Sequence, residues 1–280
     1  MRIIRSIRVL QVWRRKYATQ RIGFVPTMGA LHEGHLSLIR RARKHCSTVV
    51  VSIFVNPLQF SPSEDLSRYP RPVKSDQQLC REAGVDVLFC PSSEEFYPKD
   101  FQTTVKVNRL SQSWEGTFRP THFEGVTTVV TKLLCLVRPN RSYFGQKDYQ
   151  QLLVIKHMVK DLNIDTKIVR CSTIRESDGL ALSSRNRYLS ENQRRQAISL
   201  SVALRQGVQS IKHGQTNVQM IQNSMQKILE KFSGVRIEYL AVCDANTLST
   251  LPRVKGEVVL VGAIQIGKVR LIDNMLAKGP

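Results

Sequence analysis

The sequence predicts an α/β protein, with a Rossmann-like parallel-sheet domain over residues 1–173 and a smaller C-terminal α+β domain over residues 174–280. Two observations lead to this prediction. Short apolar runs alternate with amphipathic runs as far as residue 171, and strands that alternate with helices favour a parallel sheet. Beyond residue 174 the pattern changes to a polar segment, two helical stretches and three β-rich runs. We interpret the second domain as a lid over the first.

The chain opens with a predicted strand at Ile3–Ile4 and a predicted helix, in which apolar residues recur at helical spacing from Ile7 to Tyr17. Residues 1–32 contain seven bases and no acid, which is the composition of a mitochondrial presequence. The stretch leads directly into the next strand without a spare linker. We therefore assign it to the fold rather than to targeting.

The later elements follow from the same alternation of apolar and amphipathic runs. In the first domain we expect strands at 22–25, 48–55, 85–89, 142–144 and 166–171, and helices from residue 36, near 74–82, at 123–137 and at 149–161. In the second domain, residues 175–190 are polar and aperiodic. Helices are expected there at 191–213 and 217–232, and strands at 235–242, 258–266 and 268–272.

The chain has 280 residues and a formal net charge of +20, from 42 basic and 22 acidic side chains. No apolar stretch approaches the roughly 20 residues that span a bilayer, so no membrane association is expected. The six cysteines are scattered without a C-x-x-C pair, which indicates buried, reduced thiols and a cytoplasmic protein. The aromatic residues are sparse and are not interleaved with the bases, as a nucleic-acid stacking platform requires. We therefore expect a solvated basic face beside an anionic-substrate site, and no nucleic-acid partner.

The segment from Pro26 to His35 is the most informative in the chain. It lies between a predicted strand and a predicted helix, and Gly29 and Gly34 allow the backbone to come close to a ligand. His32 and His35 are three residues apart at the helix mouth and project to the same side. The free N–H groups and the positive end of the helix dipole suit an anion there, so the segment predicts binding of nucleotide phosphate. Two solvated turn histidines are the alternative, and the spacing is not that of a His-Glu-x-x-His zinc site.

Five sequence blocks resemble the pantoate–β-alanine ligases, which belong to the nucleotidyltransferase superfamily with a HIGH-type signature. They occur in the family's order at residues 26–35, 51–60, 119–126, 144–152 and 175–186, and the resemblance is diffuse after residue 189. Four of the five blocks follow predicted strands. Because ligands of parallel α/β sheets bind beyond the carboxyl ends of strands, this placement supports a single active site independently of the resemblance.

The resemblance implies ATP-dependent joining of (R)-pantoate to β-alanine through a pantoyl-adenylate, with release of pyrophosphate and then AMP. It implies Mg²⁺ bound with ATP, largely through phosphates and water, with no metal site of the protein's own. It also implies a homodimer, and we expect the long apolar strand at 48–55 and its following loop to lie near the interface. Catalysis is assigned to His35, His32 and Lys147. The residues expected to contact ATP are Met28, Gly29, Ala30, Leu31, His32, Glu33, Gly34, His35, Gly145, Gln146, Lys147, Asp148, Ile174, Leu182, Ser183, Ser184 and Arg185.

Pantoate has a carboxylate, two hydroxyl groups and a gem-dimethyl group, so its site needs neutral amides on an apolar wall. Gln59 and Gln151 are the candidate amides, and Asn56 is a third. Arg119 is the candidate for the β-alanine carboxylate. Without the resemblance, ordinary surface glutamines would be the simpler interpretation.

Two alternative functions remain open at this point. Another nucleotidyltransferase would share the first histidine motif, but it gives no reason for Gln59, Gln151 and residues 183–185 together. A basic RNA-binding protein on an inactive nucleotide fold would show salt-dependent RNA affinity without ATP turnover.

Overall fold

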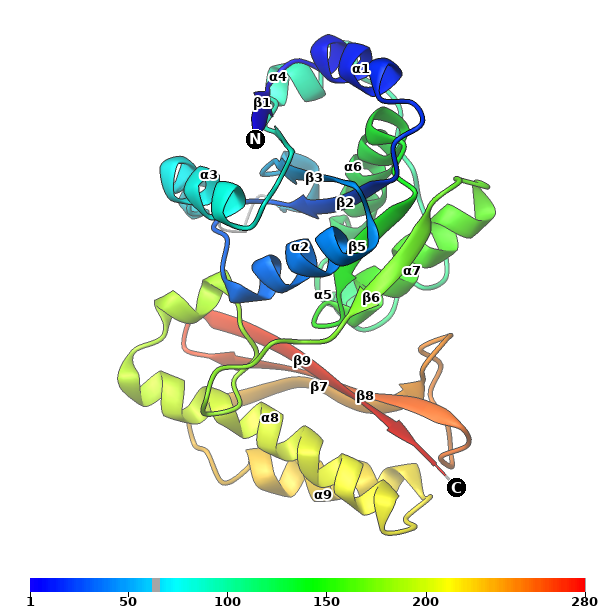
Figure 1. Cartoon of the computed structure of the whole chain (residues 1–280). Helices are drawn as coiled ribbons and strands as arrows, with labels where there is room; N and C mark the ends of the chain where they lie inside the picture. Colours follow the sequence, from blue (N-terminus) through cyan, green and yellow to red (C-terminus); the bar gives the residue numbers. More distant parts are fainter. Residues whose placement is uncertain (62–65, 280) are drawn as a thin grey trace. The chain divides into compact units, whose positions relative to one another are not determined.

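The structure, a computed structural model, describes residues 1–61 and 66–279 and divides into two compact units (Figure 1). Unit 1 consists of Met1–Gly145 and Gln150–Ser172, and unit 2 consists of Gln146–Tyr149 and Thr173–Pro280. The predicted fold class is confirmed, because unit 1 contains a parallel sheet and unit 2 an antiparallel one, each with helices. The predicted domain boundary between residues 173 and 174, which assumes that the two parts fold independently, stays a prediction.

Unit 1 is built on a six-stranded parallel sheet with the strand order β1-β4-β3-β2-β5-β6. Its strands are β1 Arg2–Ile4, β2 Ile22–Thr27, β3 Thr48–Ile53, β4 Val87–Phe89, β5 Arg141–Gly145 and β6 Lys167–Cys171. From β2 the chain proceeds through β3 to β4 in one direction, and from β5 to β6 in the other, so the winding reverses between β2 and β5. Open α/β sheets bind their ligands beyond the carboxyl ends of the strands at such a reversal.

The strands β2 and β5 are joined only near their amino ends, where Gly23 pairs with Arg141 and Phe24 with Ser142. On its other side, β2 stays paired with β3 as far as Thr27, and β5 stays paired with β6 as far as Gly145. The carboxyl ends of β2 and β5 therefore have no ladder between them. The turn from Met28 to His32 begins at this position.

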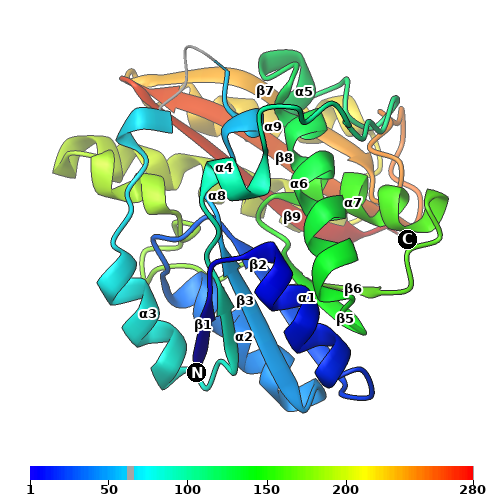
Figure 2. The same ribbon diagram turned by 90° about the horizontal axis from the view of Figure 1, so that it is seen from above.

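Helices cover both faces of the unit 1 sheet (Figures 1 and 2). On one face, α1, α6 and α7 form a hydrophobic core with Phe24 of β2 and Val50 of β3. On the other face, α2 and α3 form a second core with Val25 and Val51 of the same strands. Successive side chains of a strand point to opposite faces, so neighbouring residues enter different cores. The helices are α1 Ile7–Lys16, α2 Glu33–His45, α3 Val73–Glu82, α4 Ser93–Phe96, α5 Glu115–Phe118, α6 His122–Val137 and α7 Tyr149–Asp161, with the 3-10 helices η1 Pro57–Gln59 and η2 Leu66–Arg68.

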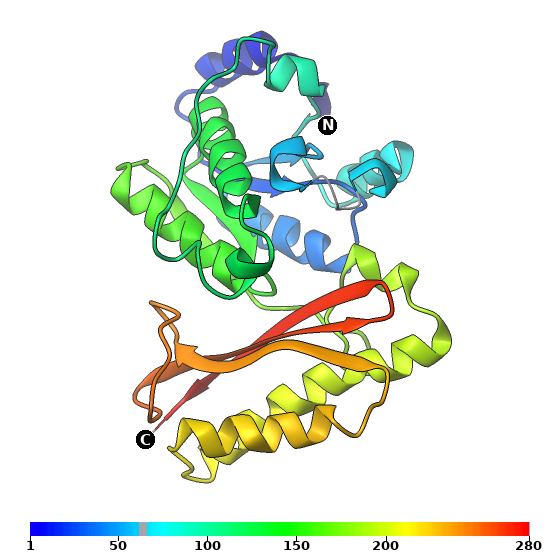
Figure 3. The ribbon, with the colours of Figure 1, turned by 180° about the vertical axis from the view of Figure 1, so that it is seen from behind.

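Unit 2 contains an antiparallel sheet of β7 Val235–Asp244, β8 Glu257–Ile266 and β9 Val269–Lys278, in that order. The helices α8 Glu191–Lys212 and α9 Val218–Leu229 pack against it (Figure 3), and η3 Ser184–Tyr188 precedes α8. The packing is close at Gly207 of α8. A Cβ atom at this position would lie 2.5 Å from Leu260 and 2.6 Å from Met225.

Several predicted elements differ from the structure. Helix α2 begins at Glu33, before residue 36, because His32 caps it. Strand β9 continues to Lys278, beyond residue 272, because its pairing with β8 continues. Residues 175–190, expected to be aperiodic, contain η3 and a β-bridge between Arg175 and Ala181. Cys135 is exposed rather than buried. The short helices α4, α5, η1 and η2 were not predicted. Among the described residues, no helix is both long and apolar enough to cross a membrane.

Candidate active site

The turn that follows β2 is held by a buried carboxylate from another helix. Gly29 and Ala30 have positive φ angles of 85° and 50°. Asp76 of α3, which is 2% exposed, accepts hydrogen bonds from the N–H groups of Ala30 at 2.9 Å and Leu31 at 2.8 Å. A Cβ atom on residue 29 would lie 3.0 Å from Asp76 Oδ2, so glycine is required there for both space and backbone angle. The carboxylate compensates for the left-handed conformation of Ala30, which costs about 1–2 kcal/mol in an L-residue.

His32 and His35 cap α2 through their ring nitrogens. His32 is the N-cap residue, and its Nδ1 accepts a hydrogen bond from the Gly34 N–H at 3.1 Å. The Nδ1 of His35 accepts one from the His32 N–H at 3.3 Å. A ring nitrogen that accepts carries no proton, so each imidazole is neutral and carries its proton on Nε2.

The two imidazoles are adjacent, with ring centroids 4.1 Å apart. Both side chains are half-buried, so neither is a freely solvated turn histidine. Each ring supplies one Nε2–H donor at the positive end of the α2 dipole. This pair of donors is the chemistry that binding of phosphate oxygens requires.

Gln59, at the end of η1, belongs to a network of buried amides. Asn56 Nδ2 donates to Gln59 Oε1 at 3.1 Å and to the Gly125 carbonyl at 3.0 Å. Asn56 Oδ1 accepts from the Tyr97 hydroxyl at 2.9 Å and from a backbone N–H of η1 at 3.3 Å. The amide of Asn56 is therefore fully used by protein partners, and it orients Gln59 so that Nε2 is the donor end, 3.0 Å from Met28 Sδ. In this arrangement Asn56 supports Gln59, and its direct contact with a substrate stays a prediction.

Arg119 and His122 hold the main chain of Gln59. The Gln59 carbonyl accepts from His122 Nδ1 at 2.9 Å and from Arg119 Nη2 at 3.3 Å. Since this His122 nitrogen must donate, the other one, Nε2, accepts from Arg119 Nη1 at 3.2 Å. Arg119 thus stabilises the Gln59 turn, and its contact with the β-alanine carboxylate stays a prediction.

Gln150 and Gln151 are adjacent in the first turn of α7 but differ in their hydrogen bonding. Gln150 is buried, accepts from the Glu115 N–H at 3.0 Å and donates to the carbonyls of Leu110 and Ser113, each at 2.7 Å. Gln151 is half-buried, and its amide has no hydrogen-bond partner within the part of the chain that the structure describes. Gln150 is therefore structural, whereas Gln151 has capacity for a ligand.

The segment Gln146–Tyr149 of unit 2 carries Lys147 and Asp148. The Lys147 ammonium lies 3.6 Å from the Asp148 carboxylate. The Tyr149 hydroxyl donates to the Ala245 carbonyl at 2.8 Å. Asp148 directly precedes α7. That it caps this helix stays a prediction.

The segment that contains Ser183, Ser184 and Arg185 is ordered by local bonds in unit 2. Leu182 N–H donates to the Ile174 carbonyl at 3.0 Å, so these two predicted ATP contacts are neighbours. Ser183 is the N-cap of η3, and its Oγ accepts from the Arg185 N–H at 3.3 Å. The two hydroxyls and the guanidinium thus lie on one short helical turn rather than on an irregular loop.

Arg194 of α8 fixes the start of this segment. Its guanidinium contacts Glu176 at 2.6 and 3.3 Å and Asp178 at 2.7 Å. Burial opposes the ionisation of Asp178, but hydrogen bonds from the Leu180 N–H and from Arg194 outweigh it and hold the pKa of this carboxyl below its usual range. The same two carboxylates raise the pKa of Arg194. The pairing of Asp178 with Arg194 is therefore between charged groups at neutral pH.

Comparison with known proteins identifies the family. A family model described as Pantoate-beta-alanine ligase matches residues 2–276. The Pantothenate synthetase of Moorella thermoacetica is 52% identical over 255 residues, which is 91% of this chain and 90% of the relative. The chain belongs to the pantoate–β-alanine ligase family.

Further relatives of this family match the whole chain. The Pantothenate synthetase of Heliobacterium modesticaldum is 48% identical, covering 99% of this chain and 100% of the relative. The crystal structure of the Thermus thermophilus enzyme has a TM-score of 0.93 and 45% identity, covering 98% and 99% of the two chains. The Francisella tularensis ligase, solved with β,γ-ATP and β-alanine, has a TM-score of 0.81 and 40% identity, covering 99% and 97%. The predicted family and its activity, ATP-dependent ligation of pantoate and β-alanine, are confirmed, and the two alternative functions are set aside.

The ligase also contains polar residues that the sequence analysis did not select. Asp76, Tyr97, Asp273 and Asn274 all contact residues of the predicted site or of the segments that carry it. Only the last two left a recognisable signal, because Asp-Asn interrupts an otherwise β-rich run at positions that are 6% and 2% exposed. Asp76 lies in an ordinary amphipathic helix and Tyr97 directly follows the short helix α4, so neither could be distinguished from a surface residue.

Proposed function

We propose that this ligase joins (R)-pantoate to β-alanine in two chemical steps. In the first step, a carboxylate oxygen of pantoate attacks the α-phosphorus of ATP and forms a P–O bond, and pyrophosphate leaves with the electron pair of the broken bond. In the second step, the amine of β-alanine attacks the acyl carbon of pantoyl-adenylate, AMP leaves, and the nitrogen loses a proton. The products are pantothenate, AMP and pyrophosphate.

The paired histidines at the start of α2 carry this proposal. An in-line displacement at phosphorus gains most from donors fixed toward the oxygens on which charge develops. His32 and His35 each supply one Nε2–H donor at the positive end of the α2 dipole, and their ring centroids lie 4.1 Å apart. We assign the α-phosphate to His35, and His32 to a neighbouring phosphate oxygen. The backbone from Met28 to Gly34 then lies along ATP, where Gly29 permits close approach.

The remaining proposed ATP contacts come from residues 145–148 and 174–185. Lys147 contributes a point charge to the phosphates, and Arg185 a guanidinium, which can bind two phosphate oxygens at once. Ser183 and Ser184 contribute hydroxyl donors from η3. The residues proposed to line the nucleotide beside them are Gly145, Gln146, Asp148, Ile174 and Leu182.

The order of the two steps gives a direct test. Pantoate alone should support exchange of labelled pyrophosphate into ATP, because pantoyl-adenylate forms and reverts before β-alanine is needed. The exchange is measured with ATP, Mg²⁺ and pantoate, with and without β-alanine. An absolute requirement for β-alanine would rule out the adenylate intermediate.

The contrast between Gln150 and Gln151 gives a test of the pantoate site. Gln151→Ala should raise the KM for pantoate by about 5–150-fold, since a polar group of the bound substrate loses a partner worth about 1–3 kcal/mol. The KM for ATP should change by less than about threefold, and the unfolding temperature should hardly change. Gln150→Ala is the matched control. It removes three internal hydrogen bonds, so it should lower the unfolding temperature more than Gln151→Ala does. Equal losses of pantoate and ATP affinity in Gln151→Ala would contradict the assignment.

Mg²⁺ is proposed to arrive with ATP and to be held by phosphate oxygens and water. Among residues 1–61 and 66–279, no group of three or more His, Cys, Asp and Glu side chains is arranged to hold a metal ion. When bound, the ion neutralises charge on the phosphates. Calorimetric titration of Mg²⁺ into the ligase should therefore give no binding heat without ATP and a clear signal with it.

We further propose a cytoplasmic homodimer without a nucleic-acid partner. The strand expected near its interface, β3, pairs with β2 and β4 and is almost entirely buried within unit 1, and its nearness to the partner stays a prediction. Part of the loop expected beside it, residues 62–65, lies outside the described residues. Sedimentation at micromolar concentration measures the assembly directly.

A further inference from the structure

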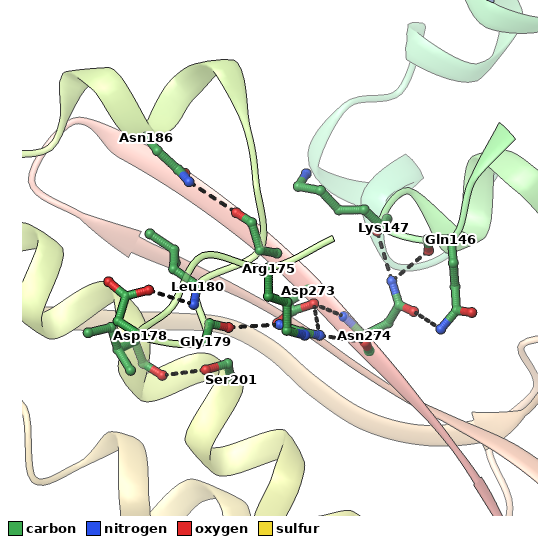
Figure 4. Close-up of polar contacts among 12 residues, drawn as sticks. Gln146, Lys147, Arg175, Asp178, Gly179, Leu180, Asn186, Ser201, Asp273 and Asn274 are labelled. Atoms are coloured by element: carbon green, nitrogen blue, oxygen red, sulfur yellow. Dashed lines mark hydrogen bonds and ion pairs between the residues drawn. The ribbon is translucent and has the colours of Figure 1, made fainter. Parts of the chain in front are cut away.

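One buried amide fixes the backbone on both sides of Lys147. The side chain of Asn274, on β9, is 2% exposed. Its Nδ2 donates to the Gln146 carbonyl at 2.9 Å and to the Lys147 carbonyl at 2.8 Å (Figure 4). These two carbonyls belong to the peptide planes that flank the Cα atom of Lys147. Both N–H groups of a single amide therefore hold the two planes that set the direction of the Lys147 side chain.

Asn274 is itself held by an ion pair. The Arg175 guanidinium contacts both carboxylate oxygens of Asp273, at 2.6 and 3.0 Å. Asp273 Oδ1 also accepts from the Asn274 N–H at 2.8 Å. Arg175 Nη1 donates in addition to the Gly179 carbonyl at 3.1 Å. The bidentate pair thus connects Asn274 to the segment from Arg175 that leads to Ser183.

The side chain of Lys147 extends away from Asn274 (Figure 4), so Asn274 contacts only the main chain of Lys147. Its Oδ1 accepts a hydrogen bond from the side-chain amide of the neighbouring Gln146 at 3.4 Å. It has no charge to offer a phosphate. The strand that carries it is paired with β8 over its whole length, which makes it a rigid support. A residue with these contacts acts on a ligand only through the residues that it holds, Gln146 and Lys147.

We infer that Asn274 is a positioning residue for Lys147, and that Asp273 and Arg175 keep its amide in place. The inference rests on the proposed contact of Lys147 with the phosphates of ATP. The ammonium group of Lys147 contributes more to the transition state when its position is set before the substrate binds, because no reorganisation is then needed. Release of the two flanking peptide planes therefore weakens catalysis without removing the charge.

The test is a double-mutant cycle on the full-length ligase, with pantoate-dependent ATP–pyrophosphate exchange as the measurement. Asn274→Ala should lower kcat/KM for ATP by about 10–100-fold. In the Lys147→Ala background the same substitution should lower it by less than about threefold, because residues that act through one another are not additive. A purely structural role would give an additive loss in both backgrounds, and that result would overturn the inference.

Gln222→Ala is the matched control. Gln222 of α9 is a half-buried residue of unit 2 whose side-chain amide also donates to a backbone carbonyl, that of Leu240 at 3.0 Å. Its truncation should leave kcat/KM for ATP within about twofold of the wild-type value. Asn274→Ser, which keeps one hydroxyl donor, should fall between wild type and Asn274→Ala. If neither Asn274 variant folds by circular dichroism, Asn274 is a stability residue and the inference is wrong.

The cycle also distinguishes this inference from the role of Lys147. A wild-type rate for Lys147→Ala alone would refute the proposed phosphate contact of Lys147. An impaired Lys147→Ala together with an unimpaired Asn274→Ala would refute the inference and leave the phosphate contact intact.

Discussion

Lys147→Ala is expected to lower the rate of pantoate-dependent ATP–pyrophosphate exchange by about 10²–10³-fold. Removal of one preorganised charged or hydrogen-bonding group from a phosphoryl or acyl transition state typically has this effect. Lys147 is well placed to act in this way, since Asn274 fixes its backbone and its only ion-pair partner within the described chain is its neighbour Asp148, at 3.6 Å. A partner at this distance does not neutralise the ammonium fully and leaves it available to phosphate.

The control for this variant is Lys156→Ala, which removes an exposed lysine from the following helix, α7. Its exchange rate should match the wild-type rate. Both variants should retain the wild-type unfolding temperature, because neither lysine is buried in a core. A Lys147→Ala enzyme within about threefold of the wild-type rate would show that Lys147 is an ordinary turn lysine.

His35→Asn is expected to lower the adenylation rate by about 10²–10³-fold while leaving the fold intact. The Oδ1 of asparagine occupies nearly the position of the imidazole Nδ1, so it can still accept from the His32 N–H, which lies 3.3 Å from Nδ1 in the structure. The substitution removes the Nε2–H donor alone. It therefore separates the phosphate contact from the capping of α2.

His35→Gln is the complementary variant. Its side-chain amide reaches the position of Nε2, so it retains a donor there but loses the acceptor for His32. We expect a smaller loss of adenylation rate than in His35→Asn. We also expect a loss of stability of about 0.5–2 kcal/mol, which is typical for a lost N-cap bond and is measured by urea unfolding. If the two variants showed the opposite order of rates, the donor role of Nε2 would be wrong.

Much of the fold could be predicted because it depends on local patterns. The alternation of apolar and amphipathic runs specifies strands and helices, since a strand covered on both faces is a continuous apolar run and a helix buries one stripe. The turn from Met28 to His32 could be placed for the same reason. Gly29, His32, His35 and the amphipathic run from residue 36 follow one another closely in the chain. The ends of β9 and α2 were less predictable, because pairing with β8 and capping by an imidazole decided them.

The roles of the amide side chains could not be predicted from sequence. Gln150 and Gln151 are identical in chemistry and adjacent in the chain, yet only Gln150 is engaged by the main chain near Leu110 and Ser113. Asn56, predicted to contact the substrate, has all of its hydrogen-bonding capacity filled by protein groups. Which amide remains available to a ligand depends on these partners.

The sequence by itself determined the α/β class, the histidine pair at the mouth of a helix and the set of residue types suited to an adenylate-forming ligase. The tertiary structure alone decided which side chains hold the site in place. Asp76 reaches Ala30 across 46 positions of the chain, and Asn274 reaches Lys147 across 127. Local propensity acts over a few residues, whereas a hydrogen bond forms wherever folding brings a donor to an acceptor, so its partners cannot be derived from local pattern.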